Sequence, residues 1–161
     1  LRKKQYLLQA GNYCKHFAFV VKGAMRQYSL DDKGVEHTVH LGIENWWVGD
    51  RESWSTGLPS RYHIDAWEHT DVLLVTRPSM IFLMQSTSFI HEMMRQLDER
   101  NNIANQRRLT SSISASAQLK YADFKNCYPD LVSRFPQHII ASYLGITKDT
   151  LSRVKRNLTR R

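Results

Sequence analysis

The chain has 161 residues, of which 42% are hydrophobic and 24% are charged, and its formal net charge is +8. This length suffices for one or two small domains with a hydrophobic core, and no apolar run approaches the roughly 20 residues that a membrane crossing needs. No signal-peptide pattern opens the sequence, which begins at Leu1 and leaves open whether a leading segment precedes it.

Only two cysteines occur, Cys14 and Cys127. One distant pair makes no disulfide framework, and two thiols cannot supply the four ligands of an iron–sulfur cluster. We therefore expect a reducing cytoplasm as the location of the protein and no cofactor.

The first half of the chain has the pattern of short strands. The apolar run Phe17–Gly23 ends in glycine, and two alternating stretches flank the turn cluster Asp31–Gly34, which predicts a β-hairpin. A further buried strand is predicted at Val72–Val75. Several short strands without βαβ alternation favour an antiparallel sandwich or barrel.

The pattern becomes helical at Pro78. Pro78–Met80 is a candidate start of a short helix, and Thr87 or Ser88 is a candidate N-cap of a longer one. The longer helix has an apolar seam with spacings of four, three and seven, formed by Ile90, Met94, Leu97 and Ala104. Packing of this helix on its own β-domain is one interpretation, and the length of the seam favours the other, a homodimer.

A helix-turn-helix pattern begins at Gln137. Its apolar positions, which form the contact between two crossing helices, are Ile140, Leu144, Ile146, Leu151 and Val154. The position that must be small is Ala141, and the position that must turn sharply is Gly145. All seven constraints are met, so we predict two helices joined by a tight turn.

The second helix of this pattern has one apolar and one charged face. Thr147 is its predicted N-cap. The segment from Pro136 to Arg161 contains six basic residues and one acidic residue, Asp149. This charge suggests a polyanionic partner, but on charge alone a merely solvated basic tail is an equal alternative. The predicted base-reading residues are Lys148, Asp149, Ser152 and Arg153, and the predicted phosphate contacts are Thr147, Lys155, Arg156, Arg160 and Arg161.

The order of these features resembles the Crp/Fnr-type bacterial transcription regulators, over nearly the full length. The resemblance is most specific in LGITKDTLSRVKRNL, residues 144–158, and weaker in the glycines of the first half, Gly11, Gly23, Gly34 and Gly49. It implies an α+β fold with an antiparallel, jelly-roll-like β-roll at 1–78, a short helix and a long dimerisation helix at 79–117, and a helix-turn-helix domain at 118–161. The implied protein is not an enzyme. It is a dimer that binds a palindromic site in double-stranded DNA, and RNA polymerase is a further expected partner.

The effector pocket that the resemblance implies is degenerate. Relatives that bind a cyclic nucleotide have a Gly-Glu pair and an arginine followed by small residues. Here Gly49 and Asp50 stand at the first pair, Ser60 stands at the arginine position with Arg61 beside it, and Tyr62 replaces a small residue. We therefore expect no response to cyclic AMP, and the effector, if one exists, is not predicted.

The alternative function is that of a β-barrel small-molecule sensor or a cupin-like metal protein that acts without DNA. His37, His40 and Glu44 are the candidate ligands. His37 and His40 are three residues apart, and a regular strand would direct them to opposite faces. The sequence thus gives this alternative little support, and we expect no metal.

Overall fold

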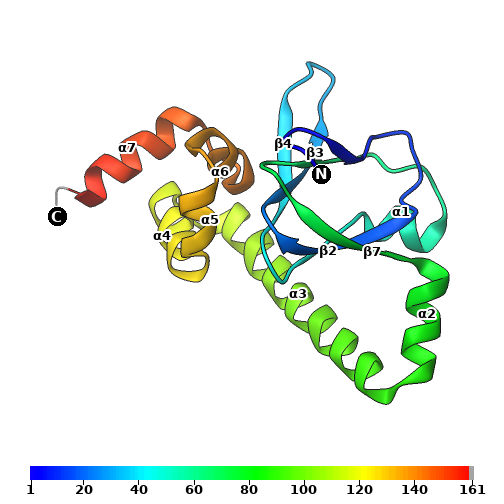
Figure 1. Ribbon diagram of the computed structural model, residues 1–161. Coiled ribbons are helices and arrows are strands. Elements are labelled where there is room, and N and C mark those ends of the chain that lie inside the picture. The colour runs from blue at the N-terminus through cyan, green and yellow to red at the C-terminus, as the bar shows by residue number, and fades with distance from the viewer. Residues whose placement is uncertain (160–161) are drawn as a thin grey trace. The chain divides into compact units, whose positions relative to one another are not determined.

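The protein is described from a computed structural model, in which residues 1–159 are described and the chain divides into two compact units (Figure 1). The first unit is Leu1–Met80 and the second begins at Ile81. Strands occur in the first unit and long helices in the second, so the expected α+β class is confirmed.

The first unit consists of two open antiparallel sheets, with strand orders β1-β6-β3-β4 and β5-β2-β7. Their bounds are β1 Tyr6–Leu8, β2 His16–Lys22, β3 Met25–Leu30, β4 Glu36–Gly42, β5 Trp47–Val48, β6 His63–Ala66 and β7 Asp71–Thr76, and the short helix α1 spans Arg51–Thr56. The strands predicted near Phe17–Gly23 and Val72–Val75 are therefore present as β2 and β7.

The predicted hairpin is formed by β3 and β4, which extend together beyond the rest of their sheet (Figure 1). In its turn, Asp31 Oδ1 accepts hydrogen bonds from the backbone N–H groups of Lys33 and Val35, both at 2.9 Å. Gly34 adopts a positive φ of 76°, which glycine tolerates at no steric cost. The turn residues that marked the hairpin in the sequence thus form it directly.

The two faces of β3 have different environments. Met25 packs into a hydrophobic cluster with residues that include Val20, Val48 and Ile64, all at most 1% exposed. Arg26, the next residue, must point to the opposite face of the pleated strand. There it is only 6% exposed, so this β-unit buries a charged group as well as an apolar core.

The Arg26 guanidinium is surrounded by carboxylate acceptors and aromatic rings. Its Nε donates to Asp65 Oδ1 at 3.0 Å and its Nη2 to Asp65 Oδ2 at 3.1 Å, while Glu36 accepts from the other side of the guanidinium. The Tyr28 ring lies 4.1 Å from Cζ and the Trp67 ring 5.5 Å away. A buried charge needs partners of this kind, so the cluster has a structural role.

The second unit is built of helices. Their bounds are α2 Arg77–Ser86, which begins in the first unit, α3 Ser88–Ser114, α4 Ala117–Cys127, α5 Pro129–Arg134, α6 Gln137–Leu144 and α7 Lys148–Thr159. The predicted short and long helices are thus present as α2 and α3. Thr87 is the N-cap of α3, although its side chain makes no capping hydrogen bond.

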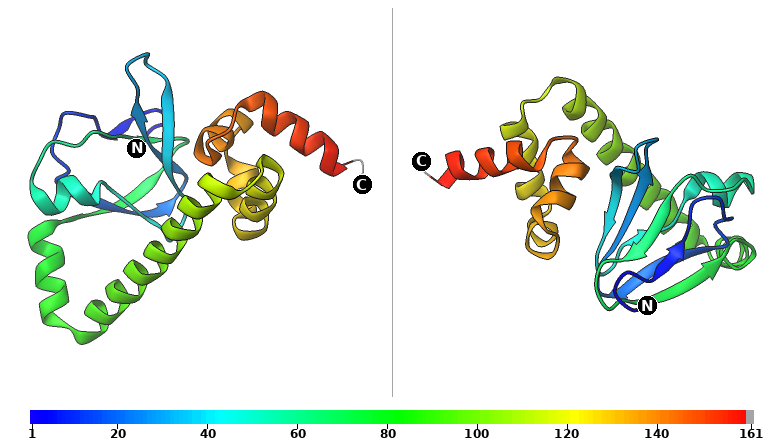
Figure 2. Two further views of the ribbon diagram at one scale, coloured as in Figure 1. Left: turned by 180° about the vertical axis from the view of Figure 1, so that it is seen from behind. Right: turned by 90° about the horizontal axis from the view of Figure 1, so that it is seen from above.

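The helices α4 to α7 gather into a separate cluster at the end of α3 (Figure 2). Their core is closed by buried side chains from each helix, among them Phe124, Leu131, Ile139 and Leu151. By contrast, α3 is 27 residues long and contains no buried residue. Across residues 1–159, no helix has both the length and the apolarity that a membrane crossing requires.

Candidate nucleic-acid interface

The predicted helix-turn-helix unit is formed by α6 and α7. Gly145 ends α6 in the left-handed conformation, with φ 65° and ψ 35°, and the N–H of Ile146 donates to the carbonyl of Ala141 at 3.0 Å. A Cβ at Gly145 would meet nothing within 4 Å, so its backbone conformation rather than space explains the glycine. The sharp turn was placed correctly by the sequence pattern.

The contact between the two helices uses the predicted apolar positions. Ile140, Ala141, Leu151 and Val154 are buried, at 3%, 1%, 0% and 9% exposure. Leu144 and Ile146 are half-buried. With these residues directed inward, the opposite face of α7 is turned to solvent.

Thr147 caps α7 as predicted. Its Oγ1 accepts the backbone N–H of Thr150 at 3.1 Å and lies 2.9 Å from the Thr150 hydroxyl. Asp149 in the first turn complements the partial positive charge of the helix N-terminus. This local chemistry sets where α7 begins and therefore which side chains face outward.

The predicted base-reading residues lie together on the exposed face of α7: Lys148, Asp149, Ser152 and Arg153 are all exposed. The Arg153 guanidinium lies 3.5 Å from the Thr150 hydroxyl, a weak contact, and leaves most of its donors unused. Of the predicted phosphate contacts, Thr147 and Arg156 are exposed and Lys155 is half-buried. Arg160 and Arg161 lie outside the described residues.

Two contacts at this unit were not predicted. The Ser152 hydroxyl donates to Gln137 Oε1 at 3.1 Å, which links the start of α6 to α7. The Arg108 guanidinium lies 4.3 Å from the centre of the Tyr143 ring, which links α3 to α6. The sequence pattern marks Gln137 only as the first position of the motif, and no spacing rule connects either pair.

The predicted effector-pocket residues are engaged within the first unit. Asp50 Oδ1 caps α1 by accepting the N–H groups of Glu52 at 3.0 Å and Ser53 at 3.3 Å. Ser60 is buried, and its hydroxyl accepts the N–H of Tyr62 at 3.0 Å. Arg61 is exposed and pairs with Glu52 at 3.2 Å.

Gly49, the remaining residue of that set, lies against the Phe17 ring, which a Cβ would approach to 2.9 Å. The glycine is therefore explained by close packing.

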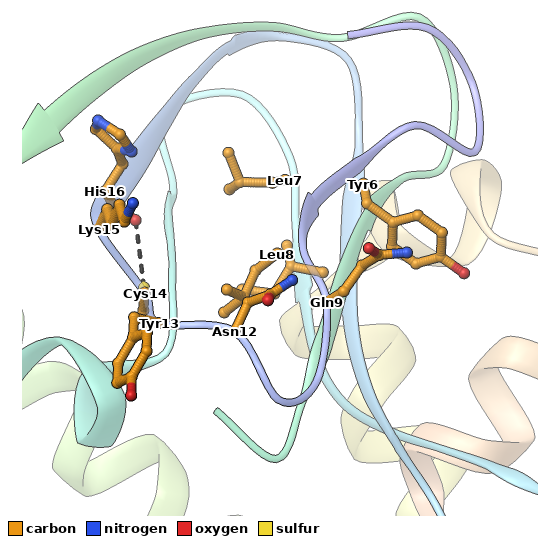
Figure 3. A pocket seen from close by; sticks show the side chains of 10 residues that line it. Tyr6, Leu7, Leu8, Gln9, Asn12, Tyr13, Cys14, Lys15 and His16 are labelled. Atoms are coloured by element: carbon orange, nitrogen blue, oxygen red, sulfur yellow. Dashed lines mark hydrogen bonds between the residues drawn. The ribbon is translucent and has the colours of Figure 1, made fainter. Parts of the chain in front are cut away.

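A cavity of about 210 Å³ lies elsewhere, along β1 and the loop that follows it (Figure 3). Leu8 and Ile64 line it together with Cys14, whose thiol donates to the carbonyl of His16 at 3.3 Å. Burial raises the pKa of the Cys14 thiol, which keeps it neutral near pH 7. None of the predicted effector residues lines this cavity.

The candidate metal ligands are not grouped. His37 Nε2 lies 3.0 Å from Asp31 Oδ2, whereas the His40 ring lies 6.1 Å from that of Trp46. Within residues 1–159, no three His, Cys, Asp or Glu side chains are positioned to hold a metal ion.

Comparisons with solved structures show the fold. FixK2 from Bradyrhizobium japonicum matches with a TM-score of 0.82 and 19% identity, over 99% of this chain and 82% of its own. The catabolite activator protein of Thermus thermophilus matches with a TM-score of 0.56 and 21% identity, over 99% and 76%. A protein assigned to the Crp/Fnr family of transcriptional regulators, from Eubacterium rectale, matches with a TM-score of 0.69 and 16% identity, over 99% and 76%.

Two of these names are those of an activator and a transcriptional regulator, and none is that of an enzyme. The chain therefore has the Crp/Fnr-type regulator fold, as the sequence predicted. No protein-family model matches the sequence, and no curated protein matches it either.

Proposed function

We propose that the protein is a DNA-binding transcription regulator that reads a palindromic duplex site as a homodimer. The observation that carries this proposal is α7, whose apolar side chains Leu151 and Val154 are buried while Lys148, Asp149 and Arg153 are exposed on one face. In a helix-turn-helix unit, the outward residues near the start of the second helix reach base edges in the major groove.

The side chains of this face have distinct roles. Arg153 suits a guanine, because its fork can donate to O6 and N7 together, and Asp149 suits the N4 amine of cytosine. Lys148 adds a donor at the start of the helix. Lys155 and Arg156, with Thr147 and the undescribed Arg160 and Arg161, contact phosphates, which position the protein without selecting a sequence.

The dimer forms through α3. Its seam residues Ile90, Met94, Leu97 and Ala104 each remain partly exposed in the single chain, and the helix has no buried residue. A second copy of α3 would cover this seam and place two α7 helices about one DNA turn apart. Other apolar side chains of α3, Ile103, Leu109 and Ile113, are exposed at 44%, 63% and 80%.

A pair of α3 variants tests the seam. Leu97→Asp is expected to shift the protein from dimer to monomer in sedimentation velocity, because it places a charge in the interface. Gln106→Asp is the matched control, since nine residues at about 100° each place it opposite Leu97. Dissociation by Leu109→Asp instead of Leu97→Asp would move the interface to the other side of the helix.

The regulator does not respond to cyclic AMP. Asp50 already caps α1 and Arg61 already pairs with Glu52, so neither is available for the ribose or the phosphate of a nucleotide without breaking these contacts. Addition of cyclic AMP is expected to leave both the melting temperature and the affinity for DNA unchanged.

Selection of bound duplexes from a random pool tests the function directly. We expect a palindromic consensus and an affinity that falls steeply with salt, because several phosphate contacts release counterions. Absence of any duplex binding at low salt would reject the proposal and favour a protein that acts without DNA.

A further inference from the structure

The start of α6 is joined to the exposed face of α7 by a side-chain hydrogen bond. The Ser152 hydroxyl donates to Gln137 Oε1 at 3.1 Å, between residues fifteen positions apart. Ser152 is one helical turn from Lys148, so the two are neighbours on the surface of α7. The Gln137 carboxamide therefore lies beside the proposed reading face.

This bond uses only half of the carboxamide. Its oxygen is occupied by Ser152, and the Nε2 group carries two further N–H donors. Among residues 1–159, no other interaction involves the Gln137 side chain. With its oxygen held, the amide presents these donors in a fixed direction.

An anion suits these donors. Gln137 is the first residue of α6, and Pro136 at the N-cap provides no side-chain capping hydrogen bond. The N-terminus of a helix favours negative charge, and glutamine is among the side chains that bind phosphate oxygens in DNA complexes. Both features favour a phosphate over a base edge at this point.

Resting on the DNA-binding function proposed above, we propose that Gln137 donates from Nε2 to a backbone phosphate and that Ser152 is the positioning residue that holds its amide. Ser152 then takes no part in base reading, contrary to the sequence-based expectation. Base selection is left to Lys148, Asp149 and Arg153.

The decisive variant is Gln137→Glu. Glutamate has the same shape and can still accept from Ser152, but it replaces the two N–H donors with a charge that a phosphate repels. An acidic residue at the start of a helix also favours helix stability. We therefore expect a loss of affinity for DNA of at least about tenfold, larger than that of Gln137→Ala, without loss of folding.

The other variants separate a phosphate contact from a base contact. Gln137→Ala is expected to weaken binding about fivefold on every duplex, with an unchanged consensus and an unchanged salt slope, because a neutral donor displaces no counterion. Ser152→Ala should weaken binding about threefold, and the double variant should bind like Gln137→Ala. Ser133→Ala, at an exposed serine of α5, is the matched control.

Three results would overturn this assignment. Wild-type affinity in Gln137→Glu would exclude the phosphate contact, and additive losses in the double variant would exclude positioning by Ser152. A changed consensus in Ser152→Ala would return Ser152 to base reading. Each of these leaves DNA binding by the wild type intact, whereas a wild type that binds no duplex rejects the proposed function itself.

Discussion

Two arginines in different regions of the molecule show opposite uses of the same side chain. Arg26 in the β-unit is 6% exposed and bound by Asp65, by Glu36 and by two aromatic rings. Arg153 on α7 is exposed, and within residues 1–159 its side chain makes a weak 3.5 Å approach to the Thr150 hydroxyl. The two arginines therefore differ in unused hydrogen-bonding capacity rather than in charge, and this capacity is what suits Arg153 to the recognition role proposed for it.

The protonation of Arg26 supports its structural role. Burial by itself lowers the pKa of this guanidinium, but the hydrogen bonds of Asp65 and Glu36 outweigh burial and leave the pKa raised. Arg26 thus keeps its charge in the folded protein, and its partners must be supplied by the fold.

The largest expected effect follows from removing that charge. Arg26→Met leaves Asp65, at 5% exposure, as a buried carboxylate without its partner. The free energy of unfolding should fall by about 3–5 kcal/mol, measured by urea denaturation. Arg61→Met is the control, because its ion pair with Glu52 is exposed and is worth about 0–1 kcal/mol. Equal losses in the two variants would contradict the distinction between buried and exposed arginines.

Removing the Arg153 side chain from α7 should affect the recognition of DNA sequence and not the stability of the fold. Arg153→Ala is expected to reduce discrimination by about 1–3 kcal/mol at one or two base pairs, and to change the free energy of unfolding by less than about 0.5 kcal/mol. Competition between single-substituted duplexes measures the first quantity and urea denaturation the second.

Arg156→Ala is the comparison within the same helix. It should weaken all duplexes alike and reduce the salt slope by about one, as expected for a phosphate contact. An unchanged site preference in Arg153→Ala, or a changed one in Arg156→Ala, would show that the roles of the two residues were assigned wrongly.

Whether a feature could be predicted from the sequence depends on whether its contacts are local or long-range in the chain. The helix-turn-helix unit depends on spacings within about 20 residues, so Gly145, Thr147 and the inward positions were all identified from periodicity and capping rules. The bond between Gln137 and Ser152 depends on how two helices cross, and side-chain pairing across a crossing has no sequence signal.

The Arg26 cluster could not be predicted for a related reason. Its charged members come from three strands, and a register shift between Gln27 and Tyr28 sets which residues of β3 and β4 lie opposite each other. A shift of one residue changes the face of every following side chain. Strand existence was therefore predictable from alternation, whereas the position of Glu36 on β4 relative to Arg26 was not.

The seam of α3 is an intermediate case. Its periodicity identified the face formed by Leu97 and its neighbours, but periodicity does not distinguish a second copy from the protein's own β-domain as the partner. The exposed apolar residues Leu109 and Ile113 lie outside the seam and had no place in that pattern.

The smallest expected effect concerns the exposed ion pair between Glu92 and Arg95 on α3. Hydrogen bonds from Arg95 and then from Gln96 lower the pKa of Glu92 to about 2. Because the folded-state pKa is depressed, this interaction favours the folded state above pH 4.5, the ordinary value, and is lost as the pH falls toward 2.

Arg95→Gln should therefore raise the Glu92 pKa, though not fully to its ordinary value, because the Gln96 amide still donates to Glu92 at 2.9 Å. Titration of the Glu92 carboxyl by NMR measures the shift, and Gln96→Ala should produce a smaller rise, since Arg95 supplies the larger contribution. Both residues of the pair are half or more exposed, at 58% and 50%, so unfolding near neutral pH should hardly change. A Glu92 pKa that stayed near 2 in Arg95→Gln would mean that Arg95 does not set the protonation of its partner, in contrast to Arg26 with Asp65 and Glu36.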